Sequence, residues 1–182
     1  LEAFPQTRFW VDVIIPELDK EAENGGLLPE VMLEGETVET AMARLLWRAI
    51  EGQAREDQIL VSSVNDRFIE AFQAHAQGKV PVAAGQQERT RFIFFHKLFL
   101  DRLYRPRVDV MVLPPAYSMI NLEDKRLIEG AHRYNMPLIY WDVTEENVVR
   151  NVLKNGADGI VTAKPDLVIR IMNEMEEFNG QS

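Results

Sequence analysis

"NGADGIVTAKPD", residues 155–166, is the stretch of sequence that decides the fold. A turn rich in Asn and Gly leads into a short apolar core, Ile160 and Val161, which is typical of a buried β-strand. Thr162 follows at once, and Pro165 then suits the first turn of a helix. This order is typical of a parallel α/β protein, in which ligands bind where strands end and helices begin.

The same order recurs along the whole chain. Apolar runs bounded by polar or turn residues predict strands within 8–15, 58–66, 79–85, 108–115, 137–143 and 158–162. Apolar positions at helical spacing predict helices over 38–50, around 68–72, and within 88–106, 122–135, 145–156 and 166–178. Six strands that alternate with six helices indicate a parallel sheet with right-handed crossovers.

Two architectures have this alternation: an open doubly wound sheet and a closed (β/α)8 barrel. Short units, with no G-x-G-x-x-G after any strand, favour the barrel, which needs eight strands and about 250 residues. We therefore expect residues 1–182 to form a single domain, an incomplete TIM-type (β/α)8 barrel without its first two β/α units. The opening "LEAFPQTRF" agrees, because it reads as a helix end, a loop and a strand. Two unpaired barrel edges would favour self-association.

Composition limits the class of partner and the compartment. The net charge of −9 and the pI near 4.9 argue against nucleic acid. The chain has no Cys, which fits a reducing compartment. No targeting signal is visible in it, and we favour a cytoplasmic location. No apolar run approaches the roughly 18 residues of a membrane span.

The stretch "PLIYWDVTEENVVRNVLKNGADGIVTAKPD" resembles the closing motif of the glycerophosphodiester phosphodiesterases: strand, Trp, polar turn, helix, then G-x-D-G-I-[IV]-T-x-x-P-D. Upstream, "LEAFPQTRFWVDVII", "ILVSSVND" and "FFHKLFLDRLYRPRVDVMVLPPAY" resemble the segments around the family's third, fourth and sixth strands, in a branch active on lysophospholipid-type diesters. Four matched segments in series are more specific than any one of them, and the resemblance identifies strands 3 to 8 of the family's barrel.

The resemblance implies metal-assisted hydrolysis of a glycerophosphodiester or a lysophospholipid, with Ca²⁺ or Mg²⁺. The family's H-R-G, E-x-D and H-D motifs belong to its first two strands, and neither of the two His motifs occurs in the 182 residues. Because phosphodiester hydrolysis needs an acid and a base, we expect the chain alone to be inactive and assign no catalytic residue in it. None of His75, His96 and His132 matches a catalytic His of the family.

Asp12 is the one residue that the resemblance implies as a metal ligand, at the position of a family Glu in an E-I-K pattern. A carboxylate in so apolar a run must be ligated or otherwise paired, and a structural hydrogen-bonding Asp is the alternative. Ile14 stands where the family has Lys and cannot contact a phosphate by charge.

Three strand-end residues are candidate substrate-binding groups: Ser63, Trp141 and Thr162. The indole of Trp141 could shape a pocket or belong to the core. The hydroxyl groups of Ser63 and Thr162 could bind a ligand or cap the chain. Ala163 stands where the family often has Asp or Asn.

Segment 92–104 is strongly apolar and carries cationic residues around it, so it predicts either a barrel helix packed on its sheet or a peripheral membrane contact.

Two interpretations of the whole chain also stay open. It is part of a phosphodiesterase, or it is a non-catalytic barrel remnant that acts as a binding or assembly module, as Ile14 and Ala163 would suggest. A relative of the phosphoinositide-type phospholipases is a third and weaker reading.

Overall fold

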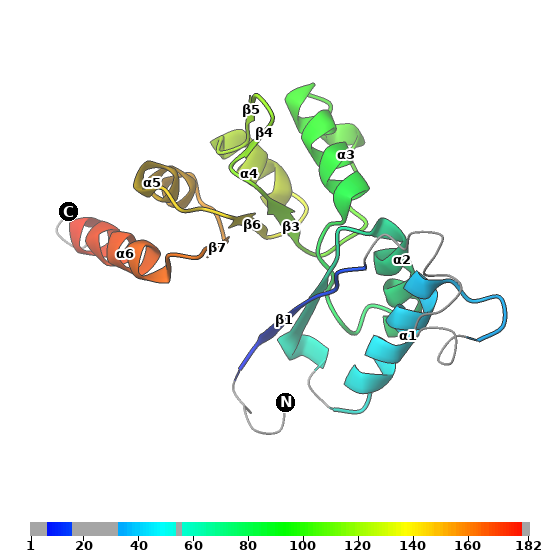
Figure 1. Ribbon diagram of the computed structural model, residues 1–182. Coiled ribbons are helices and arrows are strands. Elements are labelled where there is room, and N and C mark those ends of the chain that lie inside the picture. Colours follow the sequence, from blue (N-terminus) through cyan, green and yellow to red (C-terminus); the bar gives the residue numbers. More distant parts are fainter. Residues whose placement is uncertain (1–6, 16–32, 54–55, 180–182) are drawn as a thin grey trace. The chain divides into compact units, whose positions relative to one another are not determined.

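The computed structural model describes residues 7–15, 33–53 and 56–179 of the chain (Figure 1). The chain divides into two compact units, Leu1–Glu88 and Arg89–Ser182, which are described in turn. The expectation of a single domain over 1–182 stays a prediction. Asp19 and Lys20, which could supply from the following loop the charged groups that the first predicted strand lacks, lie outside the described residues.

The first unit is a parallel strand pair packed with two helices. Its elements are β1 (Phe9–Asp12), α1 (Val38–Ile50), the 3-10 helix η2 (Glu56–Gln58), β2 (Ile59–Ser62) and α2 (Asp66–Ala76). β1 pairs with β2 in parallel, and an isolated parallel bridge joins Val61 to Val82. The predicted strand within 79–85 is thus reduced to one bridge, because Pro81 has no N–H to donate to a ladder.

Residue alternation gives this strand pair two different faces. Ile59 and Val61 are buried with the helices, whose aromatic core includes the edge-to-face pair of Trp47 and Phe72 at a centroid distance of 6.4 Å. Trp10 and Asp12 lie on the opposite face of β1 and are exposed. The polar end of β1 therefore faces away from the helical core of this unit.

Both helices of the first unit begin at caps that the sequence provides. Thr37 accepts a hydrogen bond from the Thr40 N–H at 3.3 Å at the start of α1. At the start of α2, Asn65 Oδ1 accepts hydrogen bonds from the N–H groups of Arg67 and Phe68, at 3.0 and 3.3 Å. These side chains satisfy amides that a helix start leaves without a partner, which fixes where each helix begins.

The second unit is a three-stranded parallel sheet with helices and a small hairpin. Its elements are α3 (Gln86–Lys97, which begins in the first unit), the 3-10 helix η3 (Asp101–Leu103), β3 (Met111–Leu113), β4 (Ala116–Tyr117), β5 (Ile120–Asn121), α4 (Lys125–His132), β6 (Leu138–Trp141), α5 (Glu146–Lys154), β7 (Gly159–Val161) and α6 (Pro165–Asn179). The strand order is β3–β6–β7, and β4 and β5 form a separate antiparallel pair. The β4–β5 hairpin was not predicted.

The predicted helix within 88–106 is shorter than expected because the chain reverses at Phe99. This residue has φ 61°, in the left-handed region, and the N–H of Leu100 donates to the carbonyl of Phe95 at 2.8 Å. That six-to-one hydrogen bond with a left-handed residue before it is the Schellman helix ending. α3 therefore ends at Lys97, and η3 follows as a separate turn.

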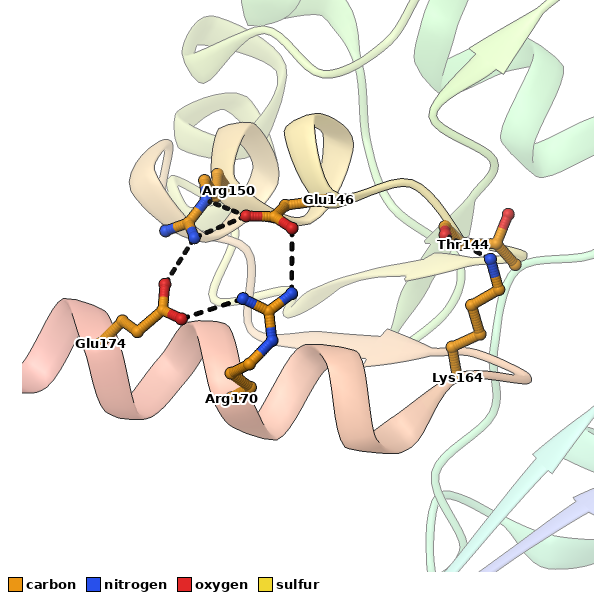
Figure 2. Close-up of polar contacts among 6 residues, drawn as sticks. All are labelled: Thr144, Glu146, Arg150, Lys164, Arg170 and Glu174. Atoms are coloured by element: carbon orange, nitrogen blue, oxygen red, sulfur yellow. Dashed lines mark hydrogen bonds and ion pairs between the residues drawn. The ribbon is translucent and has the colours of Figure 1, made fainter.

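The last two helices are joined by a ring of ion pairs (Figure 2). Glu146 and Arg150 of α5 contact Arg170 and Glu174 of α6, and each carboxylate binds both guanidinium groups at 2.5–3.0 Å. Exposed ion pairs contribute little one by one, but four in a closed ring fix the relative position of two helices. The pKa values of both Glu side chains lie below the usual range, because these Arg side chains donate hydrogen bonds to the charged form.

Candidate functional site

The carboxyl ends of β1 and β2 bring together three polar side chains. Asp12 and Ser62 are register partners at the last positions of the two strands. The hydroxyl of Ser62 donates a hydrogen bond to Asp12 Oδ1 at 2.5 Å, and Trp10 Nε1–H donates to Ser62 Oγ at 2.7 Å. Because the indole N–H can only donate, the single proton of the Ser62 hydroxyl is directed at the carboxylate.

This chain of hydrogen bonds holds one oxygen of Asp12 and leaves the other available. Asp12 Oδ2 accepts no hydrogen bond from any residue that the structure describes, and the side chain is exposed. Asp12 therefore makes the structural hydrogen bond that was one of the two alternatives left open by the sequence. Its role as a metal ligand stays a prediction.

Ser63, the neighbouring residue, lies in a different environment from Ser62. Its hydroxyl donates to the carbonyl of Val13 at 2.7 Å and accepts from the N–H of Asn65 at 3.2 Å, and the side chain is buried. Ser63 thus joins the chain after β1 to the turn that begins α2. These contacts are those of the capping alternative, and a role in substrate binding stays a prediction.

Trp141 and Thr162 lie at the carboxyl edge of the second unit's sheet. Trp141 is the last residue of β6 and pairs in register with Val161 of β7, and both side chains are exposed. Thr162 comes next after β7, and its hydroxyl donates to the carbonyl of Val143 at 2.5 Å and accepts from the N–H of Lys164 at 2.9 Å. The structure thus places an exposed indole at this edge and a hydroxyl already engaged with the backbone.

Lys164 was not selected from the sequence, although it lies at the same edge. Its ammonium group donates to the carbonyl of Thr144 at 3.2 Å, so it joins the turn before α6 to the turn before α5 (Figure 2). Ser62 was also missed, because its importance depends on register with a strand that lies 50 residues away in the sequence. Lys164 had a usable signal: a cation directly before the helix-starting Pro165, at the end of a strand.

His96 and His132 both have structural partners. His96 is buried, and its Nδ1 lies 2.9 Å from the carbonyl of Phe92, so this nitrogen carries the proton and donates. Burial lowers the pKa of His96. His132 Nε2 lies 2.7 Å from Asp158 Oδ2, and that oxygen also accepts from the N–H of Leu138.

Ca²⁺ and Mg²⁺ bind six or more oxygen atoms, usually with several carboxylates or waters among them. Over the described ranges 7–15, 33–53 and 56–179, no group of three or more His, Asp or Glu side chains is arranged to hold a metal ion. The residues described therefore form no metal site around Asp12. Within the same ranges, no helix is both long enough and apolar enough to cross a membrane.

The chain is similar to two known proteins. No family model matches the chain. A dermonecrotic toxin of Loxosceles arizonica, LarSicTox-betaID1, is 38% identical over 48 residues, which are 26% of this chain and 16% of the toxin. A solved structure from Silicibacter pomeroyi DSS-3, of a protein assigned as a glycerophosphoryl diester phosphodiesterase, superposes with a TM-score of 0.56 over 76% of this chain and 45% of that one, at 16% identity.

The structure resembles a glycerophosphodiester phosphodiesterase, as the sequence does. At 16% identity this similarity concerns the fold. The chain spans less than half of the structural relative and about a sixth of the toxin. The resemblance stated from the sequence is thereby confirmed, and the fold is of mixed α/β type with parallel strands. Among the described residues the strands form separate sheets of two, three and two strands, and none of these sheets is closed.

Proposed function

We propose that this chain is part of a phosphodiesterase that hydrolyses glycerophosphodiesters or lysophospholipids with the help of Ca²⁺ or Mg²⁺. The observation that supports it best is the position of Asp12 at the carboxyl end of a parallel strand pair, in a chain with this fold. In (β/α)8 enzymes that end of the sheet carries the chemistry. In this proposal β1, β2, the bridge at Val82, β3, β6 and β7 correspond to strands 3 to 8 of an incomplete barrel.

Asp12, Ser62 and Trp141 each have a defined part in the proposal. Asp12 provides one carboxylate oxygen to the cation, and Ser62 holds the carboxylate in orientation through Oδ1. Trp141 offers an apolar plane at the sheet edge for the glycerol or acyl part of a substrate. The 182 residues contain neither H-R-G nor H-D, so we expect no turnover from the chain alone.

Cation binding and turnover test the proposal separately. Calorimetric titration of the chain with Ca²⁺ and with Mg²⁺ should show weak binding, which Asp12→Asn abolishes. Asp57→Asn is the matched control, because Asp57 is an exposed carboxylate of the same unit in η2. Ser62→Ala should weaken binding less than Asp12→Asn does, since it removes only the group that orients the carboxylate.

Unchanged binding in Asp12→Asn would show that Asp12 is not a ligand. Glycerophosphocholine and lysophosphatidylcholine are the substrates to test, each with added Ca²⁺ or Mg²⁺. Turnover by the chain itself would contradict the expected inactivity and would require an acid and a base among its own residues.

A non-catalytic assembly module is the second candidate, and the sheet edges favour it. Among the described residues β1 pairs only with β2, and β7 pairs only with β6, so each has one edge without a strand partner. Such edges can pair with another chain. The exposed side chain of Ile14, on the same side of the extended chain as Asp12, also offers no charge to a phosphate. Light scattering over a range of protein concentrations would reveal a self-associating module by a rising mass, and a constant monomer mass would argue against it.

A further inference from the structure

We propose that one end of the second unit is a docking surface for an anionic lipid membrane. This surface, called the tip surface below, consists of the end of α3, the turn η3 and the β4–β5 hairpin. Its exposed apolar side chains are Leu98, Phe99, Leu103, Tyr117, Met119 and Ile120. Phe99, Leu103 and Met119 are 78%, 67% and 98% exposed, which is unusual for such large apolar groups and marks an interaction surface.

The parts of the tip surface are connected by polar contacts. Lys97 Nζ, at the end of α3, donates to the carbonyl of Asn121 in β5 at 2.8 Å and forms an ion pair with Asp124. The guanidinium group of Arg126 lies 3.9 Å from the ring centroid of Phe99 and 2.7 Å from a carboxylate oxygen of Asp101. The helix end, η3 and the hairpin therefore form one continuous surface.

The opposite side of α3 is packed, which separates the two roles of this segment. Phe92 and His96 are one turn apart and buried, and the ring of Phe92 lies 5.3 Å from that of Tyr104. The segment 92–104 thus packs through one side of α3 and presents its end to solvent. Packing, one of the two alternatives predicted from the sequence, is thus observed for Phe92 and His96, and the membrane contact is the part proposed here.

The backbone at Phe99 shows that the exposed ring is maintained at a cost. A bulky residue at φ 61° is a backbone outlier, and Gly is the residue that such a helix ending usually carries. Strain of this kind persists where it serves a function. Here its effect is to hold a large apolar ring in solvent beside a cation, at the point where the chain leaves α3.

Charge identifies the kind of surface that the tip would contact. At the tip surface Lys97, Arg102 and Arg126 stand against Asp101 and Asp124, a net charge of +1, whereas the whole chain carries −9. Exposed apolar groups with cations around them match an interface of anionic headgroups over acyl chains. A nucleic acid would use the same cations and would leave the apolar groups without a partner.

The position of the hairpin relates the tip surface to Trp141, the candidate residue at the sheet edge of the same unit. The hairpin begins directly after β3, and its base is fixed by two hydrogen bonds: Leu122 N–H to the carbonyl of Pro115 at 2.8 Å, and the Tyr140 hydroxyl to the carbonyl of Leu122 at 2.5 Å. Tyr140 precedes Trp141 in β6. Docking would thus bring a lipid surface to the carboxyl edge of this sheet, whether or not the chain takes part in hydrolysis.

Sedimentation of the full chain with sucrose-loaded vesicles tests the proposal. Vesicles of phosphatidylcholine with phosphatidylserine should bind the chain, and vesicles of phosphatidylcholine alone should bind it much less. Phe99→Gly combined with Leu103→Ser should lower the partition coefficient about tenfold or more, since two apolar side chains no longer enter the interface. Phe99→Gly also relieves the backbone strain, so lost binding cannot be attributed to unfolding.

Ile169→Ser is the matched control, because Ile169 is an exposed apolar residue of α6 outside the tip surface, and its binding should equal that of the unchanged chain. Arg102→Glu should weaken binding to the anionic vesicles, and high salt should do the same. Equal binding by the double variant and the unchanged chain would overturn the proposal. So would capture of duplex DNA or RNA without vesicle binding, or a loss of self-association in the double variant while vesicle binding is unchanged.

Discussion

Gly130 of α4 makes a close approach to His96 that can be tested by adding a single methyl group. A Cβ atom at position 130 would lie 2.3 Å from both Cδ2 and Nε2 of the His96 ring, whereas ordinary contacts begin near 3.4 Å. One group would therefore have to move by about 1 Å. The ring is confined by Phe92 at a centroid distance of 4.1 Å and by its Nδ1 hydrogen bond.

Two opposing effects set the magnitude for Gly130→Ala. Overpacking a buried site costs about 1–3 kcal/mol, and an overlap this large belongs at the upper end. Replacing Gly by Ala inside a helix gains about 1 kcal/mol. We expect a net loss of about 1–2 kcal/mol in the free energy of unfolding, measured by urea denaturation followed by circular dichroism.

A double-mutant cycle isolates the contact. In a chain that already carries His96→Ala the obstacle is gone, so Gly130→Ala should stabilise by about 1 kcal/mol. The sign of the effect should thus reverse between the two backgrounds. If Gly130→Ala stabilised both chains equally, the close approach of Gly130 to His96 would be wrong.

The buried state of His96 also gives a pH dependence. Burial lowers its pKa below 6.5, so the unfolded chain takes up a proton at a higher pH than the folded chain does. Stability should therefore fall as the pH decreases below about 6.5, and His96→Ala should lack this part of the decrease. The measurement is the urea midpoint of both chains at several pH values, and parallel curves would contradict it.

Three further predictions concern hydrogen bonds and ion pairs. The Arg44 guanidinium and the Leu33 N–H hold the pKa of Glu36 at about 2, so the contribution of Glu36 to stability should be complete above about pH 4.5 and disappear as the pH falls toward 2. The difference in urea midpoint between the unchanged chain and Glu36→Gln should therefore vanish over that range. A difference that persists at the acid end would refute this. Asn65→Ala should destabilise by about 1 kcal/mol in urea denaturation, because two N–H groups of α2 lose their partner, and Asn65→Asp should restore most of that loss. Glu174→Gln should cause only a small decrease in thermal midpoint, and high salt should remove it because exposed ion pairs are screened; a salt-independent decrease would show that the ring acts by packing instead.

The helices were predictable from the sequence because their signals are local. The six predicted helices all occur, and caps such as Thr37 and Asn65 mark helix starts within a few residues of the apolar periodicity. The end of α3 was not predictable, because the Schellman ending places Phe99 where the sequence rules expect Gly or Asn. The β4–β5 hairpin was missed for a related reason, since its turn contains Ser118 at φ 54° in place of Gly.

The candidate site was only partly predictable because register is not local. The sequence selected Asp12 correctly as a strand-end carboxylate, but the choice between Ser62 and Ser63 depends on which of them faces it across the strand pair. One position of register exchanges the two faces of a strand. The structure pairs Asp12 with Ser62 and directs Ser63 to the backbone of Val13.

The hydroxyl groups of Ser63 and Thr162 make the same pair of contacts in two separate units. Each donates to a carbonyl just beyond the neighbouring strand and accepts from the N–H two residues ahead. Such a hydroxyl links consecutive β/α turns, and any protein with this arrangement of strands would benefit from it whatever it binds. Relatives that have lost every catalytic group should therefore still carry Ser or Thr at both positions, so these residues identify the architecture of a descendant and not its chemistry.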